Sequence, residues 1–486
     1  MDVYVGATLK GFFGRNDTVK TDADTVKGAL DDLTKEYPDT TKVLFDDDGK
    51  LRGFINIFVN SENYTDSSLW NEKLKDDDEI VLIPSIAGGS SKRDSIISEE
   101  RRKEISFDDK EIDRWGKHLL LREIGVKGQK RIKASKVVVF GAGSLASPVI
   151  QYLAAAGVGT LKVVDDGEVS LADLQSQPIH GERDIGRPRV ASSKDKVRNI
   201  NRKSEIIAEN ISISAKNIVD ILDGFDVAVD CTENYRTRYL IGDACAIKGI
   251  PLIFGAIYQY EGMVSVFNYE GGACYRCAFS SPPEPGIVPT CAEGGSISPL
   301  SGIIGSIQAN EVLKLIIGIG EILSNKLLVY DSLNLNYRKL SIGRRKSCPI
   351  CGTNPSIYEV EDYDYDEFCG LSEKEEEVPV EGIEPEELAR RIDTGEPITI
   401  VDIREPHERA INRFPDAVVI PIGQLARRQK ELDPDVDTIF ICKEGKRSIL
   451  AINTLREAGY KGPMYNLKGG IDAAKDIIFS HEGAWL

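Results

Sequence analysis

The sequence has no excess of positive charge. Its 61 Lys and Arg residues are outnumbered by 78 Asp and Glu residues, which leaves a formal net charge of −17 at pH 7. Proteins bind phosphate backbones and anionic lipids mainly with Lys and Arg, so this balance argues against nucleic-acid or membrane partners. We also find no charged segment followed by an apolar stretch at the start, and no apolar run near the roughly 18 residues of a membrane-spanning helix. We therefore expect a cytoplasmic protein.

Histidine is scarce, and the cysteines do not suggest a disulfide framework. The chain has 4 His, which show no metal-ligand spacing, and 9 Cys. In a cytoplasmic protein such cysteines indicate metal ligands or catalytic thiols. Two C-x-x-C pairs would place four thiolates around a structural Zn²⁺, and a redox dithiol is the weaker alternative because neither pair opens a thioredoxin-like helix. The expected zinc ligands are Cys274, Cys277, Cys348 and Cys351.

The strongest fold signal is a strand, a glycine turn and a helix near the middle of the chain. Val137–Phe140 predicts a strand buried on both faces, and Gly141-Ala142-Gly143 predicts a tight turn into an Ala-rich helix. A second buried strand ends in Asp165, where ribose hydroxyls bind in nucleotide-binding α/β sheets. The third glycine of the pattern is replaced by Ala146, so a dinucleotide oxidoreductase and a turn without ligand remain alternatives.

With 486 residues, the chain is expected to form about three or four domains. Residues 1–89 predict a small α+β domain whose last residues, Ala87-Gly88-Gly89, form a thin tail that can thread into a narrow active site. Composition alone also allows a flexible linker. The segment resembles the ubiquitin-like β-grasp sulfur carriers that end in Ala-Gly-Gly. Residues 90–105, which are polar and charged, are predicted to be a linker. The predicted strands are 3–9, 54–59 and 79–84, and the predicted helix is 25–36.

The segment 106–355 resembles a family of adenylating enzymes. Its motifs are the glycine turn, the sequence LQSQ at 174–177, the strand end CTEN at 231–234, the two C-x-x-C pairs and a Pro- and Gly-rich segment around Cys291. Together they are similar to the adenylyltransferases of the molybdopterin and thiamin sulfur carriers and to the E1 enzymes. This resemblance displaces the oxidoreductase interpretation. It implies an α/β Rossmann-like domain that uses ATP and Mg²⁺ and forms a homodimer.

The resemblance also implies individual roles. Arg189 stands where a lysine is usual, Glu233 stands where an aspartate holds Mg²⁺, and Lys117 stands where an arginine reaches across the dimer. Cys291 would be a loop cysteine that accepts the carrier's carboxyl group or sulfur. The residues expected to bind the nucleotide and its metal are Gly141, Gly143, Asp165, Asp173, Ser176, Arg189, Glu233, Asn234 and Lys117.

Ser176 is the main departure from the family pattern. The family has an arginine at this position, which stabilises charge on the phosphate. Our hypothesis is that Arg183 or Arg187, one short loop away, substitutes for it. Without a substitute, adenylation would be slow or lost.

The C-terminal segment 381–486 resembles a rhodanese domain, an α/β fold. Cys442 ends a predicted strand, and the short loop after it leads into a helix, so backbone N–H groups and the helix dipole would stabilise a persulfide anion. Arg447 adds positive charge for an anionic sulfur donor. The spacing from Cys442 to Arg447 is one residue shorter than in a phosphatase loop, which favours sulfur over phosphate. The acidic, Tyr-rich residues 356–380 predict a second linker.

The three resemblances together imply ATP-dependent activation of a carrier's Gly-Gly terminus, followed by sulfur transfer from a persulfide or thiosulfate donor to give a thiocarboxylate. The carrier would be the N-terminal domain itself or a separate protein. Gly89 is joined to Ser90 by a peptide bond, so we expect a processing metalloprotease to cut there if the fused domain is the substrate. A conjugating E1 enzyme and a scaffold that only passes sulfur remain as alternatives.

Overall fold

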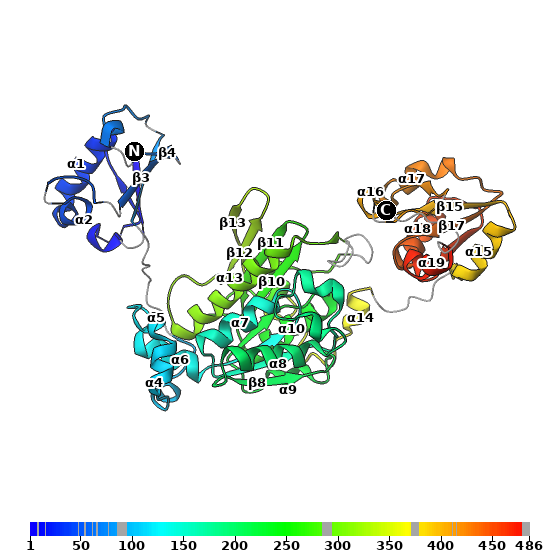
Figure 1. The fold of residues 1–486 in the computed structure, drawn as a ribbon, viewed down its shortest axis with the longest axis horizontal. Coiled ribbons are helices and arrows are strands. Elements are labelled where there is room, and N and C mark those ends of the chain that lie inside the picture. The colour runs from blue at the N-terminus through cyan, green and yellow to red at the C-terminus, as the bar shows by residue number, and fades with distance from the viewer. Residues whose placement is uncertain are drawn as a thin grey trace. The chain divides into compact units, whose positions relative to one another are not determined.

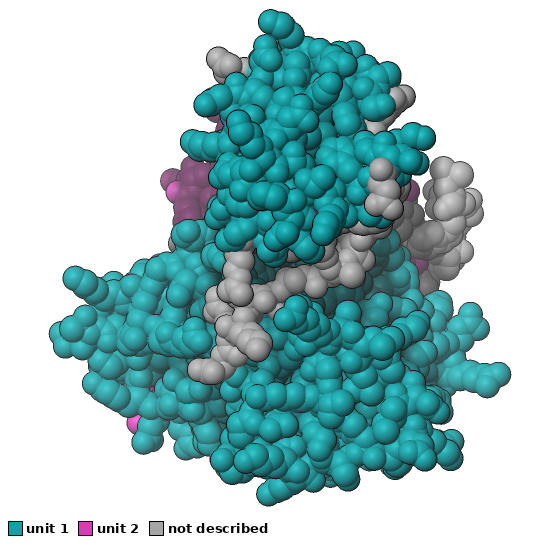
Figure 2. All heavy atoms as spheres, turned by 90° about the vertical axis from the view of Figure 1, so that its left-hand side faces the viewer, with its two compact units in different colours: residues 1–233, 237–278, 296–361 teal, residues 234–236, 279–295, 362–486 magenta. Residues whose placement is uncertain are grey.

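The computed structural model describes residues 1–6, 9–14, 16–46, 48–52, 55–60, 62–64, 67–75, 77–84, 95–283, 294–370, 379–410, 412–414 and 416–478. Their strands form three separate sheets (Figure 1). The chain divides into two compact units (Figure 2). The first unit contains the first two sheets, and the second unit contains the third sheet. Each sheet has its own hydrophobic core.

The N-terminal sheet is mixed and has the strand order β2-β1-β5-β3-β4. The central pair, β1 and β5, is parallel, and the other neighbours are antiparallel. Helix α1 begins after Thr25, whose hydroxyl accepts the Gly28 N–H at 3.1 Å, and buries Leu30 and Leu33 in the core. This is the expected β-grasp arrangement. The elements are β1 (Asp2–Val5), β2 (Thr18–Lys20), α1 (Val26–Glu36), α2 (Thr41–Leu44), β3 (Ile55–Val59), β4 (Glu62–Asn63) and β5 (Glu79–Pro84).

The central sheet has eight strands in the order β13-β12-β11-β10-β9-β6-β7-β8. Strands β10, β9, β6, β7 and β8 are parallel, and β11 to β13 extend the sheet as antiparallel strands. The buried β-branched and apolar runs of β6 and β9 are what a strand covered on both faces requires. The strands are β6 (Lys136–Phe140), β7 (Thr160–Val164), β8 (Glu205–Glu209), β9 (Val227–Asp230), β10 (Leu252–Tyr258), β11 (Glu261–Phe267), β12 (Lys326–Asp331) and β13 (Asn336–Ser341).

Helix α13 (Ser298–Ile317) is the one described helix long and apolar enough to cross a membrane. It packs against α7 and strands β10 and β11, and 61% of its most apolar 18-residue stretch is buried inside the protein, as expected for a core helix. The other helices of this region are α4 (Asp109–Arg114), α5 (Gly116–Leu119), α6 (Gly125–Ala134), α7 (Ala146–Ala156), α8 (Arg189–Ile200), α9 (Ile218–Leu222), α10 (Tyr235–Lys248) and α11 (Tyr275–Ala278).

The linker expected at residues 90–105 is folded where the structure describes it. Ile97 is 1% exposed and belongs to the core of the central sheet, and the Ser95 hydroxyl donates to the Ile316 carbonyl. Helix α3 (Glu99–Lys103) follows, and its Arg101 pairs with Asp226 beside β9. The prediction missed this packing because two apolar residues in a polar stretch find their partners far away in the sequence.

The third sheet is parallel, with the order β14-β18-β17-β15-β16. It is the α/β fold expected of the C-terminal segment. The elements are β14 (Glu381–Ile383), α15 (Pro385–Asp393), β15 (Ile398–Asp402), α16 (Pro406–Arg409), β16 (Val418–Val419), α17 (Leu425–Arg428), β17 (Asp437–Ile441), α18 (Lys446–Glu457), β18 (Met464–Leu467) and α19 (Gly470–Ile478).

The second expected linker, 356–380, is likewise partly folded. Asp364 caps the short helix α14 (Tyr365–Phe368) by accepting two backbone N–H groups. Tyr365 and Cys369 are buried, and Asp366 forms an ion pair with Arg236 in the first turn of α10. Of the tyrosines of this stretch, Tyr363 and Tyr365 pack against each other, whereas Tyr358 is exposed. Residues 371–378 lie outside the described part.

Candidate functional site

The predicted phosphate turn lies at the carboxyl end of β6. The chain is sterically tight there, because a Cβ on Gly141 (φ +94°) would stand 2.8 Å from the Cys231 carbonyl oxygen. Asp165 follows β7, and its carboxylate accepts the Ala142 N–H at 2.8 Å and the Gly167 N–H at 2.7 Å. Strand β6 lies between β7 and β9, so the turn faces the crevice where the strand order reverses. Helix α7 begins behind the turn, and its N-terminus is suited to phosphate.

Asp173 and Arg189 form a polar cluster beside this turn. Arg189 donates to Asp173 at 3.0 Å, and the Gln177 amide donates to the other carboxylate oxygen at 2.9 Å. Burial opposes ionisation of Asp173, but the Ser170 N–H and Arg189 outweigh it, so the pKa of Asp173 lies below its usual value. A built Cβ on Gly143 would lie 3.6 Å from the Gln177 amide nitrogen. The cluster therefore adjoins the turn.

Glu233 also adjoins the turn. Its carboxylate is exposed, and a Cβ on Gly143 would lie 3.8 Å from its Oε1 atom. Asn234 follows it at the start of α10. Lys117 lies on α5, and none of the hydrogen bonds or ion pairs described within this one chain joins it to the turn. The structure thus brings most of the expected nucleotide residues to one edge of the sheet, namely Gly141, Gly143, Asp165, Asp173, Ser176, Arg189 and Glu233.

Ser176 lies at the same edge, but its surroundings differ from the hypothesis. Its hydroxyl is 2.9 Å from the Ser144 hydroxyl. Arg187 is paired with Asp184 and Asp195, and Arg183 is exposed. Arg187 would have to leave two carboxylates before it could replace the missing arginine.

His180 is a site residue that the sequence analysis missed. Its ring is 7% exposed, with Nε2 at 3.0 Å from the Ala142 carbonyl oxygen and Nδ1 at 2.8 Å from the Ser192 hydroxyl. Burial lowers the pKa of His180, which favours a neutral ring that donates from Nε2 and accepts at Nδ1. Ala142, the middle residue of the turn, is thus held by Asp165 at its N–H and by His180 at its carbonyl. The only signal in the sequence was its place three residues after Gln177.

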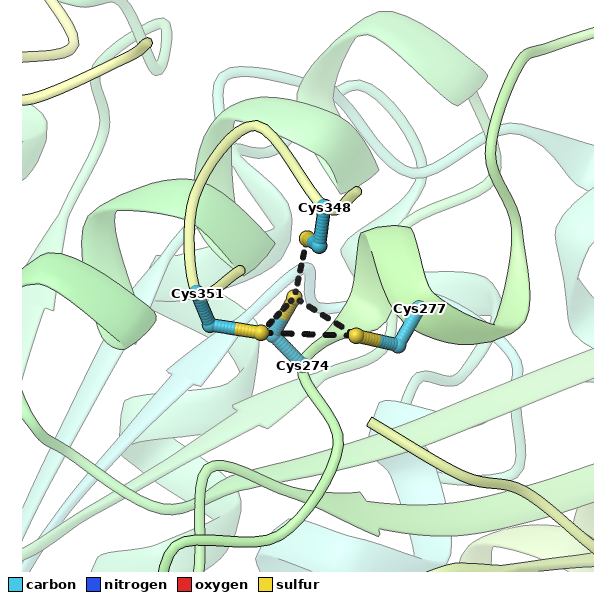
Figure 3. A group of neighbouring side chains, drawn as sticks. All are labelled: Cys274, Cys277, Cys348 and Cys351. Atoms are coloured by element: carbon cyan, nitrogen blue, oxygen red, sulfur yellow. Dashed lines mark hydrogen bonds between the residues drawn. The ribbon is translucent and has the colours of Figure 1, made fainter. Parts of the chain in front are cut away.

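The four C-x-x-C cysteines converge, as predicted (Figure 3). Their sulfurs lie within 4.8 Å of one another, with separations of 3.4 Å for Cys274–Cys348 and 3.3 Å for Cys277–Cys351. The hydrogen bond from the Cys274 thiol lowers the pKa of Cys277 below its usual value. Four sulfurs at this spacing are a donor set that fits a tetrahedral zinc ion.

A buried ion pair supports this cluster. Arg276, between the first two cysteines, is 1% exposed and forms a bidentate pair with Asp243 of α10 at 2.8–2.9 Å. The Arg345 N–H, beside the second pair, donates to Cys277 at 3.3 Å. The first pair is therefore tied to α10, and the second pair, about seventy positions further on, is tied to the first.

Cys442 lies at the end of β17, where the loop turns into α18. It is 1% exposed, and its sulfur accepts the Gly445 N–H at 3.1 Å. Gly445 has φ +88°, and a Cβ there would stand 3.0 Å from the Leu467 carbonyl oxygen, so glycine is required. The backbone thus curls around the sulfur as expected of an anion-binding loop.

Arg447 has a different immediate partner from the one expected. Its guanidinium makes two hydrogen bonds, at 2.6 and 2.9 Å, to Glu408 on α16. Burial opposes ionisation of Glu408, but Arg447 outweighs it, so the pKa of Glu408 lies below its usual value. In this structure Arg447 braces the Cys442 loop against α16.

Several predicted residues lie outside the description. These are Cys291, Gly88, Gly89 and Ser90. Cys231 and Cys245 are buried, and burial raises the pKa of both thiols, as suits packing residues.

Family models match the three sheets separately. The ThiS family model matches residues 3–89, the ThiF family model matches residues 115–350, and the rhodanese-like domain model matches residues 384–476. A nucleotide turn with a four-cysteine cluster in one α/β domain, and a strand-end cysteine in another, define a class of enzyme that joins adenylation to sulfur transfer.

Curated relatives support the same class. The chain is 37% identical to "Probable adenylyltransferase/sulfurtransferase MoeZ" of Mycobacterium tuberculosis over 75% of this chain and 92% of that protein. It is 38% identical to "Adenylyltransferase and sulfurtransferase MOCS3" of Mus musculus over 66% and 71%. It is 42% identical to "Sulfur carrier protein adenylyltransferase" of Thermus thermophilus over 54% and 97%. The chain belongs to the adenylyltransferase/sulfurtransferase family that includes MoeZ and MOCS3.

Proposed function

We propose that this protein adenylates the C-terminal glycine of a ubiquitin-like sulfur carrier with ATP and then supplies sulfur to form a thiocarboxylate. One observation carries the proposal: a glycine turn suited to a nucleotide, at β6, and a cysteine at the end of β17 whose sulfur accepts a backbone N–H occur in one chain. Adenylation gives the carrier carboxylate a good leaving group, AMP, which a nearby persulfide can then displace. Fusion raises the effective concentration of the second reactant.

In the adenylation step, the turn from Gly141 to Gly143 and the N-terminus of α7 would hold the phosphates, and Asp165 would bind the ribose. The glycine carboxylate attacks the α-phosphate, pyrophosphate leaves, and an acyl-adenylate forms. Glu233 would hold Mg²⁺, which when bound neutralises phosphate charge. Arg189 would orient the phosphates together with Lys117 of a second copy in a homodimer.

In the sulfur step, the Cys442 thiolate attacks the sulfane sulfur of thiosulfate or of a persulfide donor, sulfite or the donor thiolate leaves, and a Cys442 persulfide forms. The terminal sulfur of this persulfide attacks the acyl-adenylate, AMP leaves, and an acyl disulfide forms. The Cys291 thiolate then attacks the Cys442 sulfur, so the carrier leaves as a thiocarboxylate and a Cys291–Cys442 disulfide remains. A thiol reductant restores both cysteines.

The four-cysteine cluster would bind Zn²⁺ as a structural ion. All four positions of a tetrahedral site are filled by sulfur, which leaves none for a substrate. The ion would join the chain after β11 to the segment beyond β13 and so stabilise the sheet that carries the nucleotide turn. We place the whole reaction in the cytoplasm, where thiols stay reduced.

The domains that we assign are a carrier (1–89), an adenylation domain (106–355) and a rhodanese domain (381–486). The carrier substrate is the first of these, released by a metalloprotease between Gly89 and Ser90, or a separate protein of the same kind. The β-grasp sheet and its separate core support the first choice.

ATP–pyrophosphate exchange tests the proposal. The full chain is mixed with ATP, labelled pyrophosphate and a carrier that ends at Gly89. Exchange that requires the free glycine terminus is expected, and thiosulfate with a reductant should then yield thiocarboxylate. Carrier joined to lysine side chains would point to a conjugating E1 enzyme, and sulfur transfer without exchange would point to a scaffold.

A further inference from the structure

We propose that the Ser144 hydroxyl, paired with Ser176, donates a hydrogen bond to a phosphate oxygen of ATP at the place where related enzymes use an arginine. This inference rests on the proposed function, because it concerns the same nucleotide site. It replaces the hypothesis that Arg183 or Arg187 supplies the missing group.

The position of the hydroxyl pair supports this role. Ser144 directly follows Gly143 in the turn, at the N-terminus of α7, and is 7% exposed. Its Oγ atom lies 2.9 Å from that of Ser176. The Ser176 backbone is held on both sides, because its N–H donates to the Asp173 carbonyl at 3.1 Å and its carbonyl accepts the Ser301 hydroxyl at 3.1 Å. The pair is thus fixed where phosphate oxygens are expected.

A count of protons shows that the pair has a donor to spare. Two hydroxyl groups carry two protons, and the bond between them uses one. Among the described hydrogen bonds, neither Ser144 nor Ser176 donates its hydroxyl to any other acceptor. One O–H therefore remains for an oxygen of a bound molecule.

A neighbouring side chain also points to a ligand. Gln177 is 4% exposed, and its Oε1 atom has no hydrogen-bond partner among the described atoms, although its amide nitrogen is bonded to Asp173. This amide lies against Gly143, because a Cβ placed on Gly143 would lie 3.6 Å from the Gln177 amide nitrogen. Buried polar atoms are rarely left unpaired, so this edge of the turn is completed by something that binds there. Because an amide oxygen only accepts, its partner is a donor such as a hydroxyl group of the bound molecule and not a phosphate oxygen.

The ion pairs of a nearby arginine explain why hydroxyl groups, and not a guanidinium group, would donate to the phosphate. Arg187 is held by Asp184 and Asp195, so neither it nor the exposed Arg183 takes the place of the missing arginine. A neutral hydroxyl is a weaker partner for phosphate than a guanidinium group. We therefore expect adenylation slower than that of an enzyme with arginine.

The same geometry makes a steric prediction. An arginine side chain at position 176 would leave the backbone along the Cα–Cβ bond of Ser176, whose Oγ already touches Ser144. In the χ1 rotamer that Ser176 adopts, the Ser144 hydroxyl would stand in the path of an arginine side chain. In that rotamer, the hydroxyl must be removed before an arginine can reach the phosphates.

The first test measures binding of ATP and of adenosine by the full chain with Mg²⁺, without carrier. S144A, S144G and S176A should each weaken ATP binding about 10-fold, as expected for one hydrogen bond to a charged group, and leave adenosine binding unchanged. S306A is the matched control, because the Ser306 hydroxyl donates within its own helix to the Gly302 carbonyl at 2.6 Å. Thermal unfolding of each variant reports folding.

Unchanged ATP affinity in S144A and S144G, or equal loss of ATP and adenosine, would overturn the inference. A wild-type chain that binds neither molecule would instead overturn the proposed function. In the second test, S176R alone should not raise pyrophosphate exchange, whereas S144G/S176R should raise it above the wild type. An equal gain in both would contradict the steric argument.

Discussion

At the scale of single residues, the nucleotide turn depends on groups that contact its backbone. His180 and Asp165 together hold the Ala142 peptide, one at the carbonyl and one at the N–H. Neither contact is made to the ligand, so His180 is a positioning residue. An unsatisfied buried carbonyl costs about 1–3 kcal/mol, which is enough to move the turn away from its binding geometry.

We predict that H180F raises the KM for ATP in pyrophosphate exchange about 10-fold, because phenylalanine keeps the ring volume and removes the donor. H180Q should recover part of the loss, since an amide N–H can reach the same carbonyl. Rhodanese activity serves as the control for an intact chain. A wild-type KM in H180F would show that the contact has no role in binding.

The same residue predicts a pH dependence of stability. Burial lowers the pKa of His180 from its ordinary value of 6.5. Between the pKa in the folded chain and 6.5, the unfolded chain therefore binds the proton more readily than the folded chain does. The contribution of neutral His180 to the free energy of unfolding is fully present above pH 6.5 and is lost as the pH falls through the pKa of His180 in the folded chain. Denaturant unfolding at pH 7.5 and 5.5 should show a smaller loss for H180Q than for the wild type. Equal losses would assign the dependence to other groups.

At the scale of elements, the strand ends carry the chemistry, and other elements brace them. The Cys442 loop is held to α16 by the Arg447–Glu408 pair, and the four-cysteine cluster joins the segments after β11 and β13. Each of these supports joins parts of a single domain that are far apart in the sequence. Loss of one support should therefore affect only the domain that contains it.

For the cluster, we predict about one Zn²⁺ per purified chain and its loss in C348S. The central domain should then unfold at a lower temperature, because metal binding is coupled to folding. Thiosulfate sulfurtransferase activity should be unchanged, since Cys442 lies in another sheet. Metal analysis with a two-probe melting curve measures both. A folded wild-type chain without zinc would contradict the assignment.

For the loop, we predict that C442A abolishes sulfur transfer from thiosulfate and leaves pyrophosphate exchange intact. E408Q should reduce sulfur transfer about 10-fold, because it leaves the buried Arg447 guanidinium without its carboxylate. E386Q is the matched control, at an exposed glutamate in the first turn of α15. Loss of exchange in C442A would show that the two activities are coupled.

At the scale of the whole molecule, the order of domains sets a limit on the reaction. The glycine that must be activated is followed by Ser90, so the fused carrier has no free carboxylate. Adenylation of this domain therefore requires a cut, whereas a separate carrier requires none.

We predict that intact-mass analysis of the protein from its native cells finds a species that ends at Gly89. Part of it should carry the mass shift of one sulfur in place of oxygen. Replacement of Gly89 by Val should block the cut and leave only full-length chain, and Gly11→Ala, where a Cβ would meet no atom within 4 Å, is the control. Full-length chain alone in the wild type, beside a thiocarboxylated separate carrier, would refute the cut.

Local sequence pattern predicted the N-terminal sheet, the buried strands on both sides of the glycine turn and the four cysteines, whereas the C-terminal sheet was predicted from the resemblance to rhodanese domains. Burial on both faces forces a run of apolar residues, as in β9, and a tight turn forces glycine, as at Gly141; both leave a mark within a few neighbouring positions. The strand predicted at 79–84 has these bounds in the structure. Such features depend on neighbours in the sequence.

Only the tertiary structure decided the contacts that complete each site. The Ser144–Ser176 bond, the His180–Ala142 bond and the Arg447–Glu408 pair each join residues more than thirty positions apart. Residues 95–103 are polar enough to read as a linker, yet Ile97 finds its core partners far along the chain. Side chains that meet only when the sheet is assembled leave no periodic pattern, because their spacing is set by topology and not by the geometry of one helix or strand.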